Sequence, residues 1–460
     1  MAMGEKESQT QGEFWIATQD LARTEGHPFY ERLNQVLKEH RFDAFVERRC
    51  LKFYKEGGRP SIPPGVYFRM LMVGFFEGLD SERGIAWRCA DSLALRAFLG
   101  YGLTETTPEH STLSVIRQRL DVRTHRQVFR WVAIVLAKAG LLKGKTVGVD
   151  STTLVANAAM KSIVRRETGQ SYEEFLGELA RNAGLKDPSR EDLAKLDRQR
   201  KKKGSNEEWV NPHDPEAKIA KLKDGRTHLA YKDEHAVDLD TGAVLAVTVQ
   251  AADLGDTGSL PQTVDETLDN LVVVGRDAEA EKRLHPDTFA ELVTDKGYHS
   301  NEVLVDVQEM GTRTYVAEPD RGARKWKGKT AERKAVYANR RRVRGTRGKR
   351  LMRKRGEYLE RPFAHSLETG GMRRVYLRGA ENILKRLLIH VAGLNLALLM
   401  RKTFGLGTPR GLQGLAGALL ERSLVLWACL NARVDRWVRT AVALWPNALR
   451  MADSAIEAAA

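Results

Sequence analysis

The spacing of apolar residues changes near residue 140, and this change constrains the fold more than any other feature. Between residues 28 and 138 apolar residues recur at helical intervals, in segments separated by Gly and Pro. From residue 145 short β-type runs appear instead: KTVGVD, two runs in THLAYKDEHAVDLDTGAVLAVTVQAA around a turn at 240–242, FAELVTD and TRTYVAEP. The helical pattern SNEVLVDVQEMG lies between the last two runs. Strands that alternate with helices predict an α/β core behind an all-helical N-terminal region.

Positive charge is concentrated in one segment. The chain has 75 Lys and Arg against 60 Asp and Glu, a formal charge of +15. Residues 321–355 contain 17 Lys or Arg and one acid, Glu332, so the rest of the chain is nearly neutral. A phosphate backbone selects such a segment, because each neutralised phosphate releases counterions. A solvated, disordered basic loop is the alternative. The acidic residues nearby favour a nucleic-acid partner.

Cysteine usage and hydropathy indicate the compartment. Cys50, Cys89 and Cys429 are far apart and odd in number, so neither a disulfide framework nor a thiolate zinc site is expected. The N-terminus lacks an apolar signal-peptide region, and the apolar stretch 412–430 is interrupted by two charged residues. We expect a reducing cytoplasm, no signal peptide and no membrane span.

Several polar motifs have structural explanations. GLLKGKT at 140–146 has three residues between its two outer glycines and precedes a strand, unlike a phosphate-binding loop, so no ATP site is expected. His228 and His235 are an odd number of residues apart on one strand, which directs them to opposite faces and argues against a shared metal. Asp256 follows Gly255, and a turn or helix N-cap explains it better than a ligand role.

Two predicted strands end in an aspartate: Asp150 in VGVD and Asp295 in LVTD. In open α/β sheets the functional crevice lies beyond the carboxyl ends of the strands, so these aspartates could converge on one site. Two-metal phosphoryl transfer uses hard oxygen ligands and calls for a third acid. Glu360, in EYLERPFAH directly after the basic segment, is the best candidate.

The motifs VGVDSTTLVANA, THLAYKDEHAVDLDTG, AADLGDTGSL, TDKGYHS and LERPFAHSLETGGMRR follow one another in this order. Together they closely resemble bacterial insertion-sequence transposases of the DDE class, which have a ribonuclease-H-like catalytic core. GRPSIPPGVYFRMLMVGFFEGL resembles the N-terminal domain of one branch of that class. The resemblance covers roughly residues 28–402, and several ordered motifs are more specific than any single one.

The resemblance implies that Asp150, Asp295 and Glu360 are the catalytic acids and hold two Mg²⁺ ions, with Mn²⁺ able to substitute. The implied activity is a DNA transposase that binds terminal inverted repeats, cleaves the DNA and joins the 3′-OH ends to target DNA. Double-stranded DNA and further copies of the chain, in a homodimer or larger assembly, are the expected partners. No ATP and no membrane are expected, and the location is the bacterial cytoplasm at the nucleoid. A nuclease without strand transfer and a catalytically inactive, domesticated DNA-binding protein are the alternatives.

One departure from the family pattern concerns the glutamate. Many relatives carry Arg four residues before it and Lys seven after, where this chain has Gly356 and Leu367. Glu357 matches the first of these positions but not the second, so Glu360 is preferred and Glu357 is the alternative. Pro362 is tolerated in the first helical turn, which predicts that Glu360 lies at or just before a helix start.

Cationic and aromatic side chains near the acids are candidate DNA contacts. The set comprises Lys232, Lys296, Tyr298, Trp326, Arg340, Arg341, Arg342, Arg344, Arg347, Arg353, Arg361, Arg373 and Arg374. Lys and Arg form charge-assisted hydrogen bonds with phosphates, although Arg also packs structurally. The Trp could stack on an unpaired or flipped base, or anchor its own loop, which is the more common use.

The chain is therefore expected to be an α/β protein with a ribonuclease-H-like mixed sheet. Its expected parts are a flexible tail (1–27), a helical DNA-binding or dimerisation domain (28–140), the DDE catalytic domain (141–405) and a helical C-terminal region (406–460). Insertions are expected in the catalytic domain at about 160–226 and 319–356. Apolar helical stretches are expected at 412–430 and 432–446.

Overall fold

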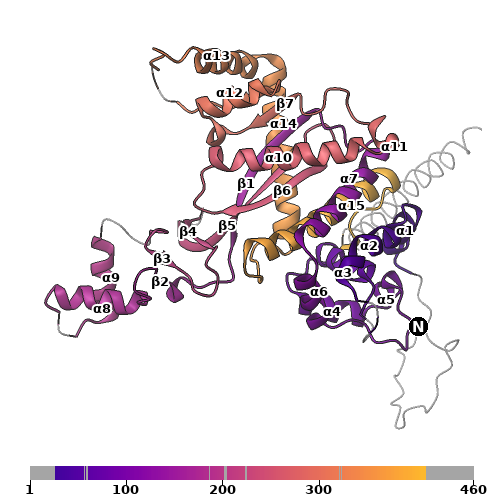
Figure 1. Cartoon of the computed structure of the whole chain (residues 1–460), viewed down its shortest axis with the longest axis horizontal. Coiled ribbons are helices and arrows are strands. Elements are labelled where there is room, and N and C mark those ends of the chain that lie inside the picture. The colour runs from indigo at the N-terminus through magenta and orange to yellow at the C-terminus, as the bar shows by residue number, and fades with distance from the viewer. Residues whose placement is uncertain are drawn as a thin grey trace, which may run out of the picture.

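A computed structural model of the chain is shown in Figure 1. It describes residues 26–55, 57, 61–185, 187–200, 205–222, 225–320, 322 and 324–410. The predicted helices at 412–430 and 432–446, and nearly all of the predicted N-terminal tail, lie outside these residues.

The N-terminal region is all helical, as its apolar spacing predicts. The helices are α1 (Pro28–Glu39), α2 (Phe42–Cys50), the short 3₁₀ turn η1 (Leu51–Phe53), α3 (Pro64–Glu77), α4 (Glu82–Asp91), α5 (Leu93–Leu99), α6 (His110–Arg119) and α7 (Val122–Lys138). Side chains of Ser81, Ser92 and Asp121 cap α4, α5 and α7 by accepting hydrogen bonds from backbone N–H groups of the first turn. Helix α3 is buried along nearly its whole length, so it forms the centre of this region.

The core is a mixed six-stranded sheet. Its strands are β1 (Thr146–Val155), β4 (Lys218–Lys221), β5 (Thr227–Asp238), β6 (Val244–Ala251), β7 (Glu291–Thr294) and β8 (Arg313–Val316). The strand order is β4-β5-β1-β7-β8, and β6 also pairs with β5. Strands β1, β7 and β8 run parallel, whereas β5 is antiparallel to β1 and β6. The predicted α/β class with a mixed, ribonuclease-H-like sheet is confirmed.

Helices cover both faces of this sheet. Helix α10 (Asp256–Gly275) packs on β5 and β6, followed by the short α11 (Ala278–Glu281). Helix α14 (Thr346–Phe363) crosses β1 and β7. Successive strand residues point to opposite faces, and Ser151 contacts α10 whereas Asp150 contacts α14. The two helices therefore lie on opposite faces.

Helix α15 (Ala380–Phe404) joins the sheet to the N-terminal helices. It packs against α3, α7 and β6, and the Asn395 side chain both donates to and accepts from the backbone of Val244. Of the helices in the described ranges, α15 alone is long and apolar enough to cross a membrane. Its apolar stretch is almost entirely buried within the molecule, as expected of a core helix.

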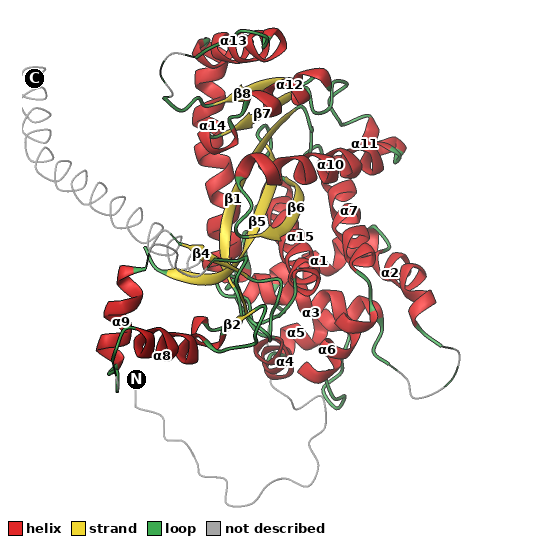
Figure 2. Cartoon of the chain, turned by 60° about the vertical axis from the view of Figure 1, so that its left-hand side comes forward, coloured by secondary structure: helices red, strands yellow, loops and turns green. Residues whose placement is uncertain are grey.

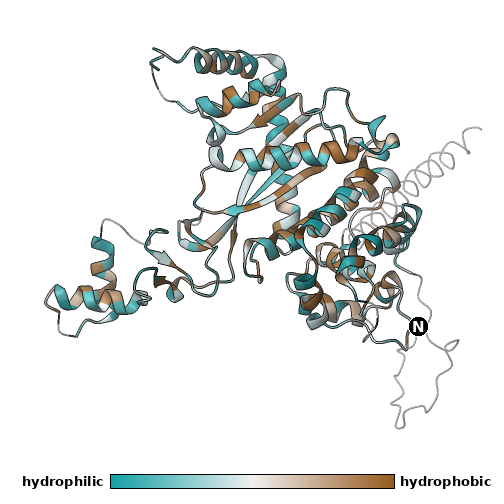
Figure 3. Cartoon of the chain, viewed as in Figure 1, coloured by the Kyte–Doolittle hydropathy of each residue, from teal (hydrophilic) through white to brown (hydrophobic). Residues whose placement is uncertain are grey.

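The insertion at about 160–226 forms an arm on the side away from the N-terminal helices (Figure 1). It contains η2 (Met160–Ser162), the paired short strands β2 (Val164–Arg165) and β3 (Trp209–Val210), α8 (Tyr172–Asn182) and α9 (Arg190–Gln199). The arm is largely hydrophilic (Figure 3), and its small core forms where the buried Trp209 meets Tyr172 and Phe175. Its last part, β4, joins the main sheet, so the segment is not wholly a surface addition.

Within the described residues the basic segment is helical from Thr330 onward, so its reading as a disordered loop is wrong there. After η3 (Lys296–Tyr298) and α12 (Asn301–Glu309), helix α13 (Thr330–Arg344) packs on α12, and α14 follows at once (Figure 2). Both basic helices bury apolar side chains, among them Val336 and Leu351. This apolar stripe anchors the segment despite its charge.

The prediction that Glu360 lies near a helix start is also wrong. Pro362 stands near the C-terminal end of α14, and the backbone continues into a π-helical segment, η4 (Ala364–Thr369). Proline cannot supply the N–H of a regular helical hydrogen bond, and a local change of helical register accommodates that loss. Glu360 therefore lies close to the end of a long helix.

Candidate active site

Asp150 lies near Asp295. In the parallel pair of β1 and β7, Gly148 lies opposite Val293, and Asp295 directly follows the end of β7 at Thr294. Asp295 is near enough that its charge raises the pKa of Asp150. Neighbouring strands are about 4.8 Å apart. The β1 strand continues to Val155, because β5 pairs with it as far as that residue. Asp150 is therefore in the middle of its strand, not at the end as its sequence suggests.

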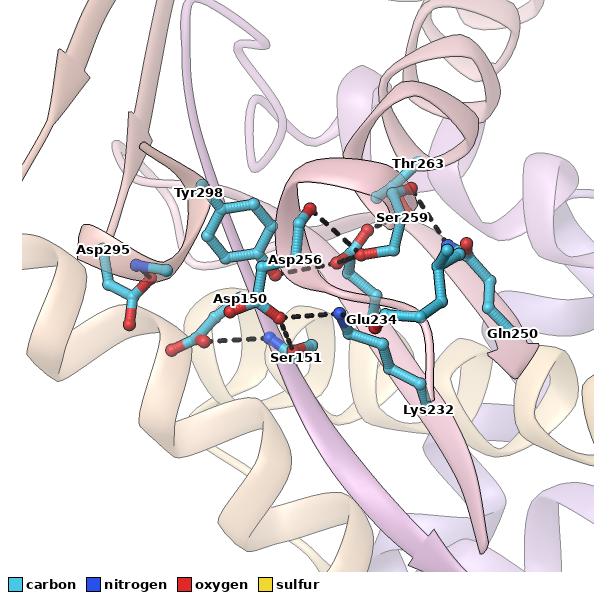
Figure 4. Close-up of polar contacts among 12 residues, drawn as sticks. Asp150, Ser151, Lys232, Glu234, Gln250, Asp256, Ser259, Thr263, Asp295 and Tyr298 are labelled. Carbon is cyan, nitrogen blue, oxygen red and sulfur yellow. Dashed lines mark hydrogen bonds and ion pairs between the residues drawn. The ribbon is translucent and has the colours of Figure 1, made fainter. Parts of the chain in front are cut away.

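The Asp150 carboxylate is partly buried and holds two hydrogen bonds. Oδ1 accepts from the Ser151 N–H at 2.8 Å, and Oδ2 accepts from the Arg355 guanidinium at 3.3 Å. Burial raises the pKa of Asp150, and the neighbouring charges of Asp295 and Asp256 raise it further, whereas the Ser151 N–H and Arg355 lower it. In Figure 4 the carboxylate extends toward Asp295. Asp150 is thus an anion held among other anions, which favours binding of a cation.

Asp295 caps the turn that follows β7. Its Oδ1 accepts from the Gly297 N–H at 2.8 Å and so starts η3. A Cβ at Gly297 would lie 3.1 Å from this oxygen and closer still to Oδ2 of Asp256. Only a residue without a side chain fits between the two acids, so Gly297 lets the carboxylates approach.

Asp256 is not a helix cap. The N-cap of α10 is Gly255, and Asp256 is the first helical residue. Its Oδ1 accepts from Lys232 Nζ at 2.6 Å and from Ser151 Oγ at 3.3 Å (Figure 4). Lys232 is buried and also donates to the Leu254 carbonyl at 3.1 Å. The interpretation of Asp256 as a cap is therefore wrong. Its carboxylate instead lies among Ser151, Lys232 and Gly297, close to Asp150 and Asp295.

Behind the aspartates, the buried Glu234 links three elements. Its Oε1 accepts from Ser259 Oγ and from Tyr298 Oη, both at 2.7 Å, and Oε2 accepts from the Thr263 hydroxyl (Figure 4). Burial raises the pKa of Glu234, and these three hydroxyls lower it. The network ties β5 to α10 and to the η3 turn, and so holds the segment that carries Asp295.

A second buried polar pair lies on the other face of β5. His235 is directly across from Asp150 in the strand register and stacks on Phe363 with ring centroids 4.4 Å apart. Its Nε2 lies 3.0 Å from Asp233 Oδ1. His228, on the same strand, lines a pocket described below.

The structure places Glu360 on α14 without a contact to either aspartate among the described residues. Its side chain is exposed, and Glu357 forms an ion pair with Arg361 on the same helix at 2.9 Å. Arg355, one and a half turns earlier, reaches Asp150 instead. Within the described ranges no three His, Cys, Asp or Glu side chains stand close enough to hold a metal together.

The candidate DNA contacts divide into held and exposed side chains. Lys232 and Tyr298 are buried, Arg340 pairs with Glu318, Arg342 donates to Thr314, and Arg347 pairs with the buried Glu291. Exposed members are Lys296, Arg341, Arg344, Arg353, Arg361, Arg373 and Arg374, of which Arg361 pairs with Glu357 and Arg373 with Glu368. The exposed side chains, Arg347 among them, are the ones that DNA can reach, and Arg347, Arg361 and Arg373 would first have to leave their ion pairs.

Trp326 is half-buried beside Tyr337, with ring centroids 6.1 Å apart, and the Arg324 guanidinium lies 5.8 Å from its ring. These contacts fit the anchoring use of this side chain.

Sequence reasoning missed Arg355, Asp256 and Glu234. Arg355 lies in a run of cations in which no local signal separates it from its neighbours. The alternation of β5 predicts that Lys232 and Glu234 share a face, and that pattern was the available signal for the buried network.

Two family models match the chain. Residues 18–119 match a transposase domain (DUF772), and residues 194–396 match a transposase DDE domain, together about two thirds of the chain. Asp295 and Glu360 lie within the second match, whereas Asp150 lies between the two. No curated protein and no solved structure matches the chain. The helical N-terminal region and the mixed sheet fit both family matches, and the chain belongs to the insertion-sequence transposases of the DDE class.

Proposed function

We propose that this transposase binds the terminal inverted repeats of its element, cleaves the DNA and joins the freed 3′-OH ends to target DNA. The observation that carries the proposal is that Asp150 on β1 lies near Asp295, which directly follows the adjacent parallel strand β7, so that their charges interact. Membership of the DDE family supplies a metal-dependent polynucleotidyl transferase, and DNA as its substrate. DNA binding, cleavage and strand joining are the parts of the proposal that experiment tests.

The donor set fits a hard divalent cation. Carboxylate oxygens are the ligands that Mg²⁺ prefers, and the raised pKa of Asp150 reflects burial and anionic neighbours that a cation would offset. Asp150 and Asp295 would hold Mg²⁺, or Mn²⁺ in its place, with Glu360 as the third acid. Two bound ions would activate the attacking oxygen and stabilise the leaving oxygen of the phosphodiester.

The chain's own residues supply position and charge. Glu234 and Tyr298 hold the turn of Asp295, and Gly297 leaves room for the acids to approach. Arg355 neutralises Asp150 and lies on the same helix as the third acid. Rigid support of this kind lowers the cost of orienting a scissile phosphate.

One face of α14 connects the positive charge to Glu360. Lys349, Arg353, Gly356 and Glu360 follow at intervals of four, three and four residues, so they share a face of the helix, and both cations are exposed. A DNA backbone that follows Lys349 and Arg353 would reach the end of the helix that carries Glu360. We therefore retain Glu360, with Glu357 as the alternative third acid.

The domain roles follow from this assignment. Residues 28–140 would bind DNA ends or a second copy of the chain, and residues 141–405 would perform the chemistry. Two element ends must be held together for joining, so a homodimer or larger assembly on DNA is part of the proposal.

The test uses two labelled substrates with Mg²⁺: an intact element end, which reports cleavage, and a pre-cut end with target DNA, which reports joining. We expect Asp150→Asn and Asp295→Asn each to lose cleavage and joining at least about 100-fold while binding DNA normally, because each removes one metal ligand. Glu360→Gln should lose both activities, whereas the matched Glu357→Gln should keep them. Undiminished cleavage by Asp150→Asn would refute the site, and cleavage without any joined product would identify a nuclease instead.

A further inference from the structure

A pocket of about 480 Å³ opens beside the aspartates, and we propose that it holds one nucleotide of the DNA strand that passes through the site. We name it the β1 pocket. Residues 151–153 and Val155 of β1 form one wall, and the loop that enters α10 forms another. Its volume lies within the range of about 300–1,000 Å³ of small-ligand sites. The inference rests on the proposed function, since the occupant is part of the DNA substrate.

The pocket is continuous with the candidate active site. Ser151 follows Asp150 directly, and Ser151 and Asp256 both line the pocket while they hydrogen-bond to one another at 3.3 Å. The Asp256 carboxylate also faces Gly297 beside Asp295. A strand whose phosphate lies at Asp150 and Asp295 would therefore place a neighbouring nucleotide at the β1 pocket.

The walls combine the two chemistries that a nucleotide needs. Val155, Leu222 and Leu254 give an apolar surface for a base or sugar, and Leu254 is 39% exposed. The side chain of Lys232 is more than nine-tenths buried, and its ammonium is fixed by Asp256 and by the Leu254 carbonyl. Hydroxyls of Ser151 and Thr153 add hydrogen-bonding groups.

The rim carries positive charge. Arg373 lines the pocket and Arg374 follows it, and both are exposed. Lys221 precedes the lining residue Leu222 and is also exposed. A nucleotide within a phosphodiester strand matches a half-apolar pocket with a cationic rim better than a neutral ligand does. A double helix could contact the rim, but its paired bases could not enter.

The experiment compares binding of fluorescent oligo-dT with that of a duplex of equal length, by anisotropy, using the full chain carrying Asp150→Asn to prevent cleavage. Ala252→Phe fills the pocket from the α10 side, and Arg373→Gln removes charge at its rim. We expect Ala252→Phe to weaken oligo-dT binding about tenfold and Arg373→Gln about threefold, with duplex binding unchanged. Photocrosslinking from 5-iododeoxyuridine should label a peptide that lines the pocket.

Matched controls are Ala278→Phe and Arg378→Gln, which change exposed residues outside the pocket and should leave oligo-dT binding unaltered. Equal losses for single strand and duplex, or no loss with Arg373→Gln in a normally folded protein, would overturn the proposal. The two proposals can fail separately. If the pocket variants bind oligo-dT normally, the pocket proposal fails, but the cleavage test with Asp150→Asn is not affected. Conversely, cleavage by Asp150→Asn would refute the active site whatever the pocket binds.

Discussion

The carboxylate of Asp150 is partly buried and lies near two other acids, which disfavours its charged form. Burial, together with the charges of Asp295 and Asp256, raises its pKa against the lowering effect of the Ser151 N–H and Arg355. A carboxyl whose pKa is raised on folding contributes stability that is fully present below its unfolded pKa. That contribution is lost as the pH rises through the folded pKa. At neutral pH the ionised Asp150 carboxylate therefore lowers the stability of the folded protein.

This linkage gives a measurable pH dependence. We expect Asp150→Asn to unfold at a higher temperature than the parent at neutral pH, because the variant never bears the buried charge. The difference should vanish below about pH 3.9, where the parent's carboxyl is also neutral in the unfolded chain. Thermal unfolding followed by circular dichroism across this pH range is the measurement. A variant less stable than the parent at pH 7 would contradict the argument.

Arg355 and a divalent cation would both bind the carboxylate of Asp150. The guanidinium donates to Asp150 Oδ2 at 3.3 Å, and two positive charges near one carboxylate repel each other. We expect Arg355→Gln to bind Mn²⁺ about threefold to fivefold more tightly, a range set by a partly exposed ion pair. Electron paramagnetic resonance of free Mn²⁺ measures this directly. Lys354→Gln, which removes the ion pair of the adjacent residue to Asp240, is the control and should leave the affinity unchanged.

The sequence alone predicts Asp150 and Asp295 as site residues, but it does not predict Arg355 or the role of Asp256. Asp150 and Asp295 each follow a short apolar run that is recognisable without the fold. Arg355 is one cation among 17 in its segment, and only the crossing of α14 over β1 distinguishes it. Asp256 looks like a helix start because Gly precedes it, and its contact with Lys232 depends on how α10 meets β5.

At the scale of elements, the 18 residues of α14 have three structural roles. Its inner face packs on the sheet through Leu351 and Leu359, its Arg355 contacts Asp150, and its exposed face carries Lys349 and Arg353. Charge density alone predicted a solvated segment, because the apolar positions are few and widely spaced. Which face of α14 packs inward and which is exposed becomes clear only from its position on the sheet.

A glycine inside α14 provides a test of how this helix is built. A Cβ at Gly356 would meet no atom within 4 Å, whereas a Cβ at Gly348 would clash with the backbone of Arg342 and Val343. We expect Gly356→Ala to stabilise the protein by about 0.5–1 kcal/mol, because alanine loses less backbone entropy in a helix. Gly348→Ala, in the same helix, should destabilise it by about 1–3 kcal/mol. Urea unfolding measures both, and equal effects would contradict this account of the helix.

At the scale of the whole molecule, α15 connects the N-terminal helices to the sheet. The helix follows every described strand in the sequence, yet it packs against α3 and α7 near the start of the chain. The apolar sequence of α15 indicates a buried helix, but it does not indicate which elements the helix packs against. Contacts between residues this far apart depend on the complete fold.

DNA binding by the whole molecule should depend on salt. We expect the logarithm of affinity for duplex DNA to fall linearly with the logarithm of salt concentration. Replacing Lys349, Arg350 and Arg353 together by Gln should reduce the slope by about 0.9 for each DNA phosphate that the variant no longer neutralises. Arg347→Gln is the matched control from the same helix. Arg347 is paired with the buried Glu291, so its replacement should lower the unfolding temperature and leave the slope unchanged.

The two aspartates that stand side by side in the sheet are separated by almost a third of the polypeptide. A ribosome that has synthesised the chain through β6 has already released Asp150, but the strand that sets Asp295 next to it does not yet exist. Under the proposed function, a chain made only through β6 therefore lacks one of the two aspartates of the site and is not expected to cut DNA.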